Sequence, residues 1–164
     1  MKMVSRTHRG WVRVRNEDAV SINESQRLAM LADGMGGLFA GRLASRLALD
    51  SVAQFIAASD IASASMAEAG EAEIAALLIK SIEHAHACII EYSQALEMGQ
   101  QMGTTIVLWY ARGDRWVAAH VGDSRLYLVG AAQIVQLTKD HSLGQRMLDE
   151  GEIEDGVDVL AQYG

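Results

Sequence analysis

The feature that most constrains the fold is a change in hydrophobic period along the chain, from two to about 3.6 and back to two. Residues 19–22 alternate between apolar and polar, and residues 28–32 form an unbroken apolar run, typical of a strand buried on both faces. Two long helical patterns follow at 38–57 and 71–97. Alternation returns in four further segments, 104–111, 115–121, 126–129 and 133–137. Strands, then helices, then strands predict an α+β fold with helices covering sheet faces.

Short polar connections join the predicted strands. Residues 23–26 predict a hairpin loop between the first two strands, and Gly113-Asp114 and Gly130 predict tight turns later in the chain. The four C-terminal strands with short turns therefore predict one antiparallel meander. Extended segments are also expected at 2–7 and 12–15, on either side of a turn at Gly10.

Asp33 ends the apolar run at 28–32, and three of the next four residues are glycine. A hard divalent cation prefers carboxylate, carbonyl and water oxygens, and Gly34 lets its own backbone carbonyl approach a ligand closely. The alternative is a strand that ends in an ordinary turn, since Asp-Gly is common turn chemistry. The segment alone favours neither interpretation.

Two glycine-rich phosphate loops are excluded for this segment. The dinucleotide fingerprint that could begin at Gly34 and Gly36 has Phe39 in place of its third glycine. The nucleotide P-loop spacing of Gly36 and Gly41 is followed by Arg42-Leu43, so its lysine and hydroxyl are missing. A carboxylate–metal site fits better than either loop.

Two more acids, Glu17 and Asp18, precede the strand at 19–22. An antiparallel hairpin between the first two strands would bring both close to Asp33. Because like charges repel, a cation is the natural neutraliser of such a cluster. The alternative is that Glu17 and Asp18 face solvent.

Composition narrows the class of protein. The chain has 164 residues, half of them hydrophobic, which is enough for a single domain, 1–164, with its own core. A net charge of −7 argues against a nucleic-acid partner. Basic residues nevertheless crowd the first fifteen positions, as a solvated strand face or as a cationic approach for an anionic substrate: Arg6, His8, Arg9, Arg13 and Arg15. With one cysteine, no apolar leader and no membrane-spanning run, we expect a cytoplasmic domain with no membrane partner.

Three blocks of sequence, in this order, resemble the protein phosphatase 2C family of metal-dependent serine/threonine phosphatases. The first is 10–18 (GWVRVRNED), and the second is 33–37 (DGMGG) with Gly41 and Ala44-Ser45. The third combines 102–105 (MGTT), 122–125 (GDSR) and 137–142 (LTKDHS). Met35 after Asp-Gly is similar to the bacterial branch, and the resemblance spans roughly residues 4–154.

The resemblance implies a β-sandwich of two antiparallel sheets with helices on both outer faces, in α-β-β-α layers. It implies a protein phosphatase that hydrolyses phosphomonoesters with two Mn²⁺ or Mg²⁺ ions and a third, weaker metal. Phosphorylated serine/threonine proteins would be its substrates, and a cognate serine/threonine kinase an implied partner. The implied roles are metal bridging for Asp33, a carbonyl ligand for Gly34, metal binding through water for Glu17 and Asp18, phosphate binding for Arg13 and the third metal for Asp123.

The chemistry has a physical basis that does not depend on the family. A phosphate monoester is doubly charged and resists attack by water. Two cations about 3.5–4 Å apart can hold the attacking and leaving oxygens, and a metal generates a nucleophile near neutral pH. The planar guanidinium of Arg13 can bind phosphate oxygens in pairs.

The sequence also departs from the family. Two C-terminal metal-binding aspartates are missing, and Asp155-Gly156 lacks the preceding apolar strand, so we expect an N-terminal portion of the fold that binds metal weakly. The alternative function is a weak or inactive fragment that serves as a regulatory or interaction domain. His8 and Arg42 stand where the family often has an acid. Met35 cannot donate a proton to the leaving group.

Overall fold

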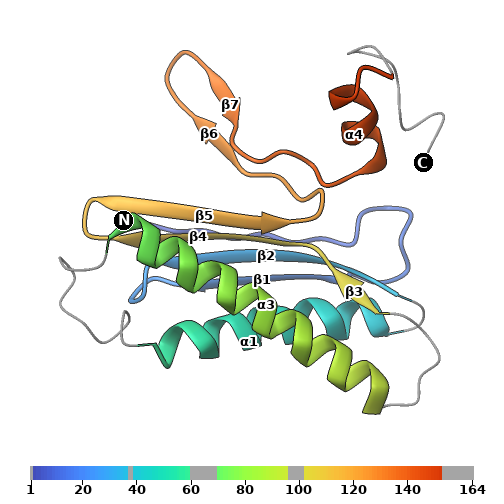
Figure 1. Ribbon diagram of the computed structural model, residues 1–164. Coiled ribbons are helices and arrows are strands. Elements are labelled where there is room, and N and C mark those ends of the chain that lie inside the picture. The colour runs from blue at the N-terminus through green and yellow to red at the C-terminus, as the bar shows by residue number, and fades with distance from the viewer. Residues whose placement is uncertain (1, 37–38, 60–69, 96–101, 153–164) are drawn as a thin grey trace.

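The structure, a computed structural model, describes residues 2–36, 39–59, 70–95 and 102–152 (Figure 1). The end of the helix predicted at 71–97 and Asp155-Gly156 lie outside the described residues. The elements are β1 (Asp18–Asn23), β2 (Leu28–Met35), α1 (Ala40–Ala57), α3 (Glu71–Ala95), β3 (Gly103–Thr104), β4 (Ile106–Arg112), β5 (Arg115–Val121), β6 (Tyr127–Val129), β7 (Ile134–Gln136) and α4 (Leu143–Asp149).

The predicted α+β fold with antiparallel sheets is confirmed. The larger sheet has the strand order β1-β2-β4-β5, and the short β3 pairs with the end of β2. All of these pairs are antiparallel, and the register of β1 and β2 sets Asp18 opposite Asp33. The predicted hairpin therefore brings two acids from different strands to the same end of the sheet.

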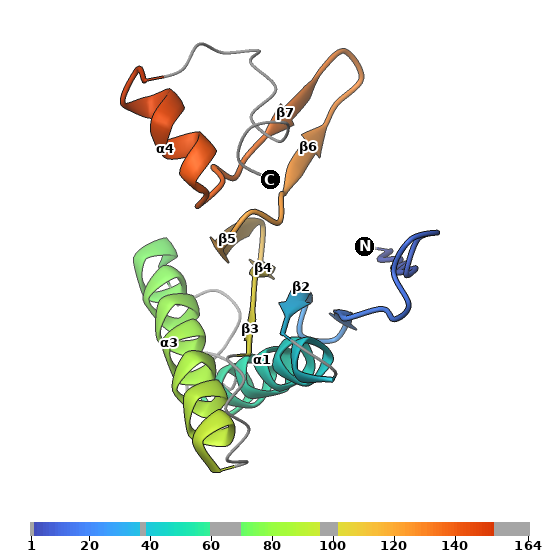
Figure 2. The same cartoon turned by 90° about the vertical axis from the view of Figure 1, so that its right-hand side faces the viewer.

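Helices α1 and α3 lie on one face of this sheet (Figures 1 and 2). Small side chains at Ala44 and Ala48 recur along the buried face of α1, which lets that helix approach β2 closely. Leu78 of α3 and Leu108 of β4 are fully buried in the same layer. The buried core consists of Leu28, Met30, Ala32, Leu49, Val52, Ile56, Ile74, Leu77, Leu78, Ala85, Ile106, Leu108 and Tyr110. No helix among the described residues is long and apolar enough to cross a bilayer.

Two expectations near the start of the chain are wrong. Residues 2–7 and 12–15 form no strands, because local contacts hold the turn instead: Gly10 N–H donates to His8 Nδ1 at 3.0 Å, and Gly10 has a φ of +73°. The interpretation of Asp33-Gly34 as a turn also fails. Strand β2 continues to Met35, since β1 and β3 supply pairing partners on both sides of its end.

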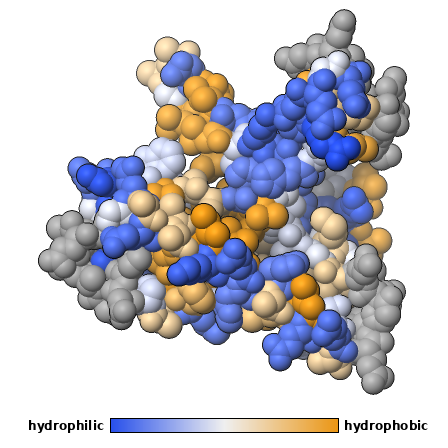
Figure 3. All heavy atoms as spheres, viewed as in Figure 1, coloured by the Kyte–Doolittle hydropathy of each residue, from blue (hydrophilic) through white to orange (hydrophobic). Residues whose placement is uncertain are grey.

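The predicted four-stranded C-terminal meander is wrong as well. Strands β4 and β5 complete the large sheet, whereas β6 and β7 form a separate hairpin. Gly122, with a φ of +101°, turns the chain away after β5. The β6–β7 hairpin projects beyond the large sheet and carries an apolar surface (Figures 1 and 3).

The sequence also gave no indication of α4. This helix has seven residues, about two turns, which is too short for a helical period to be recognised in the sequence. Its N-terminus is capped by Ser142, whose Oγ accepts a hydrogen bond from Gln145 N–H.

Candidate metal and phosphate site

A cavity of about 740 Å³ opens where β1 and β2 meet, at the end that carries the paired acids. The predicted site residues from three separate sequence blocks all line it: Arg13, Glu17, Asp18, Asp33, Gly34 and Asp123. The alternative that Glu17 and Asp18 merely face solvent is therefore not supported, because both are partly buried in the wall of this cavity.

The carboxyl groups of Asp18 and Asp33 face one another across the β1–β2 pair. The pKa of Asp33 is raised from its ordinary value, first by partial burial, then by the charge of Asp18 and a side-chain hydrogen bond with it, and then by the charge of Asp123. The nearby guanidinium of Arg13 acts in the opposite direction. Such mutual repulsion is what a bound cation would relieve.

Asp18 is oriented by a short chain of hydrogen bonds from the N-terminal segment. Asn16 Nδ2 donates to Thr7 Oγ1 at 2.7 Å, and Thr7 Oγ1 donates to Asp18 Oδ2 at 3.3 Å. Asp18 N–H donates in turn to Asn16 Oδ1 at 3.2 Å. Residues before β1 thus position a carboxylate at its first residue.

Two glycines make room for oxygens beside Asp33. A Cβ atom added to Gly34 would lie 1.9 Å from Gly41 O and 2.8 Å from Glu17 O. A Cβ atom added to Gly41 would lie 2.5 Å from Glu17 Oε2 and 2.8 Å from Gly34 O. The Gly34 carbonyl and the Glu17 carboxylate therefore converge at the start of α1, and only glycine fits at either position.

Thr105 connects Asp33 to the loop that carries Asp123. Its Oγ1 accepts a hydrogen bond from Asp33 N–H at 3.0 Å and lies 2.7 Å from Ser124 Oγ. Its own N–H donates to Asp33 O at 2.9 Å. The sequence alone does not predict this contact; its only sign there is that Thr105 and Ser124 belong to the blocks 102–105 and 122–125.

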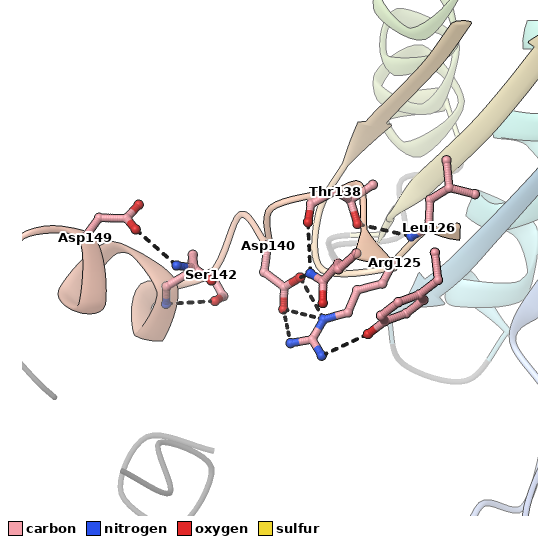
Figure 4. A network of polar contacts seen from close by, with 9 residues as sticks. Arg125, Leu126, Thr138, Asp140, Ser142 and Asp149 are labelled. Atoms are coloured by element: carbon pink, nitrogen blue, oxygen red, sulfur yellow. Dashed lines mark hydrogen bonds and ion pairs between the residues drawn. The ribbon is translucent and has the colours of Figure 1, made fainter. Parts of the chain in front are cut away.

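The Asp123 loop is also held from the other side, by residues 138–142. Arg125 makes an ion pair with Asp140, with its Nη2 2.6 Å from Oδ2 (Figure 4). This pair lowers the pKa of Asp140 from its ordinary value, mainly through the hydrogen bonds from Arg125. Gly122 and His141 are joined by two hydrogen bonds, from His141 N–H to Gly122 O at 3.0 Å and from Gly122 N–H to His141 Nδ1 at 3.3 Å. Two parts of the third sequence block, 122–125 and 137–142, thus meet around one loop.

The donor set fits hard divalent cations. The candidate ligands are all oxygens, from the carboxylates of Glu17, Asp18, Asp33 and Asp123 and the carbonyl of Gly34, and Mn²⁺ and Mg²⁺ prefer oxygen. Within the described ranges, however, no three His, Cys, Asp or Glu side chains stand close enough to hold one ion together.

Comparison with known proteins identifies the family. A family model described as protein phosphatase 2C matches residues 8–147, so the chain belongs to the protein phosphatase 2C family. The serine/threonine phosphatase Stp of Listeria monocytogenes is 38% identical over 151 residues, which cover 90% of this chain and 58% of Stp. The serine/threonine protein phosphatase PstP of Mycobacterium tuberculosis is 36% identical over 155 residues, covering 93% of this chain and 27% of PstP.

Solved structures agree with this assignment. The catalytic domain of PstP in complex with two manganese ions has a TM-score of 0.74 and 35% identity over 92% of this chain and 60% of that one. The serine/threonine phosphatase of S. agalactiae has a TM-score of 0.77 and 33% identity, with the same shares covered. The chain thus spans about 60% of the solved relatives and less of the curated ones.

Proposed function

We propose that this chain contributes the N-terminal part of a metal-dependent protein phosphatase that hydrolyses phosphoserine and phosphothreonine esters. The observation that carries the proposal is the pairing of Asp18 with Asp33 in a cavity that Arg13 also lines. The carboxylates can hold cations, and the guanidinium beside them can bind phosphate. Phosphoryl transfer to water uses this combination of groups. Phosphorylated proteins and the kinase that modifies them are the corresponding partners.

Each residue of the site is assigned a role in binding metal, in binding phosphate or in positioning another residue. Asp33 and the Gly34 carbonyl would hold two Mn²⁺ or Mg²⁺ ions, with Glu17 and Asp18 acting through water and Asp123 at a third, weaker site. When bound, these ions supply a nucleophile at neutral pH and neutralise charge on the phosphoryl group. Arg13 orients the phosphate through paired hydrogen bonds. Thr105 keeps the Asp33 and Asp123 segments in register.

A non-catalytic regulatory or interaction domain is the second candidate. It is favoured by the absence, among the described residues, of any group of three acids, histidines or cysteines placed to share one ion. A site with so few charged ligands would bind metal weakly.

Manganese-dependent release of phosphate from p-nitrophenyl phosphate and from a phosphothreonine peptide separates the two candidates. We expect hydrolysis by the purified chain, slower than by a relative such as Stp, and its loss in Asp33→Asn. Asp114→Asn makes the same chemical change in the turn between β4 and β5, at the far end of the sheet, and should leave the rate unchanged. A rate that equals the protein-free blank would refute catalysis by this chain and favour the second candidate.

A further inference from the structure

We propose that Ser45 is a positioning residue of the metal site, because its hydroxyl fixes Glu17 to the start of helix α1. This inference rests on the proposed function, in which Glu17 binds metal through water, and adds to it a residue that supports this acid. Ser45 is 0% exposed and is not among the residues that line the cavity, so it can touch neither a metal ion nor a substrate. Its effect on the site must therefore pass through a neighbouring residue.

The hydroxyl of Ser45 forms a hydrogen bond outside its own helix. Ser45 Oγ donates to the carbonyl oxygen of Glu17 at 2.6 Å, and it lies 3.2 Å from the carbonyl oxygen of Arg42, three residues earlier in α1. A buried hydroxyl needs an acceptor, and a serine within a helix commonly finds one in the preceding turn. Ser45 makes its shorter bond to a residue 28 positions away in the sequence instead.

Ser81 of α3 shows the ordinary arrangement. It is also 0% exposed, and its Oγ donates to the carbonyl oxygen of Leu78, three residues earlier in the same helix, at 2.7 Å. Both serines lie on the buried face of a long helix. They differ in that the hydroxyl of Ser45 joins its helix to the segment that enters β1, whereas the hydroxyl of Ser81 bonds within its own helix.

The backbone of Glu17 lies just outside the large sheet. The antiparallel register of β1 and β2 begins with Asp18 opposite Asp33, one residue after Glu17. Strand pairing therefore does not fix the carbonyl group of Glu17, and the Ser45 hydroxyl supplies a hydrogen bond to it.

The side chain of Glu17 lies against the same face of α1. A Cβ atom added to Gly41 would lie 2.5 Å from Glu17 Oε2 and 2.9 Å from Glu17 Cδ. Gly41 and Ser45 are four residues apart, so they share one face of the helix. One turn of α1 thus contacts Glu17 at both ends, its carboxylate at Gly41 and its carbonyl oxygen at Ser45.

These contacts make the orientation of the Glu17 carboxylate depend on α1. Groups that orient the ligands of a metal affect affinity strongly, and their loss typically costs 10- to 100-fold. Ser45→Ala removes the hydrogen bond but leaves every acid of the site in place. Because Glu17 is assigned a role through water, we expect a loss at the lower end of that range, about tenfold in the affinity for Mn²⁺.

The test measures Mn²⁺ affinity by electron paramagnetic resonance in the whole chain and its variants. Ser45→Ala should bind about tenfold more weakly, whereas Ser81→Ala, the matched control, should change the affinity by less than about twofold. In a Glu17→Gln background, Ser45→Ala should cause no further loss, because Ser45 acts through Glu17. In the metal-free chain, the NMR resonance of the Glu17 carbonyl carbon should move in Ser45→Ala and stay in Ser81→Ala.

Ser45→Cys keeps the size of the side chain with a weaker donor, and it takes the place of Ser45→Ala if the alanine variant loses its normal circular dichroism. Equal affinity in the wild type and the Ser45 variant, an equal loss in Ser81→Ala, the same loss in the Glu17→Gln background, or an unmoved Glu17 resonance would each overturn the inference alone. A wild-type chain that binds no Mn²⁺ at millimolar concentration, although the Glu17 resonance responds to the substitution, would instead refute the proposed metal site and with it the role of Ser45.

Discussion

Replacing Thr105 by valine tests how the site is held together. Thr105 is 4% exposed, and valine keeps its shape while removing Oγ1, which accepts the Asp33 N–H and contacts Ser124 Oγ. Each hydrogen bond contributes about 0.5–1.5 kcal/mol, so we expect the free energy of unfolding to fall by about 1–3 kcal/mol. Because the two contacts bridge β2 and the Asp123 loop, the affinity for Mn²⁺ should fall as well.

Urea denaturation followed by circular dichroism measures this effect, with an unchanged m-value as evidence that the folded state is intact. Ser124→Ala removes only one of the two contacts and should cost about half as much. The double variant should then be less destabilised than the sum of the single variants, since they share one interaction. A loss below about 0.5 kcal/mol in Thr105→Val would refute the role that we assign to this residue.

Three further substitutions test separate parts of the structure. Gly34→Ala should destabilise the protein by more than about 2 kcal/mol in urea denaturation, because the added Cβ would lie 1.9 Å from the backbone oxygen of Gly41; wild-type stability would contradict this packing. Asp33→Asn should stabilise the metal-free protein at pH 7. The raised pKa of Asp33 means that its charged form is disfavoured in the folded state, so this gain should vanish as the pH falls below the ordinary aspartate pKa; thermal melts that show a constant or opposite difference would exclude this effect. Arg125→Ala should cost about 1 kcal/mol at neutral pH, because its ion pair with Asp140 is half-exposed on the arginine side. The lowered pKa of Asp140 means that this contribution is present above the ordinary aspartate pKa and lost at lower pH, which a pH series of melts can check.

The pairing of Asp18 with Asp33 could be predicted because it depends on a hairpin between neighbouring segments of the chain. A short polar loop at 23–26 and two flanking apolar segments were sufficient to predict the β1–β2 hairpin, and the antiparallel register then placed Asp18 opposite Asp33. The helices could be predicted for a similar reason, since their buried faces recur with a period that a single stretch of sequence contains.

Contacts between distant segments could not be predicted in this way. Thr105 is 72 residues from Asp33, and no local pattern indicates that its hydroxyl accepts the Asp33 N–H. Strand β6 leaves the sheet of β5 after Gly122, which has a φ of +101°, and the alternation of apolar residues gives no sign of such a turn. Residues 2–15 have strand-like composition, but within the part of the chain that the structure describes no strand pairs with them.

Titration of the metal-free chain with Mn²⁺, followed by the electron paramagnetic resonance of the free ion, tests the central claim most directly. We predict saturable binding that is abolished in Asp33→Ala and retained in Asp114→Ala, because Asp33 is the acid to which we assign the metal-bridging role. Equal Mn²⁺ affinity in the wild type and in Asp33→Ala would contradict the claim that this end of the sheet is a cation site.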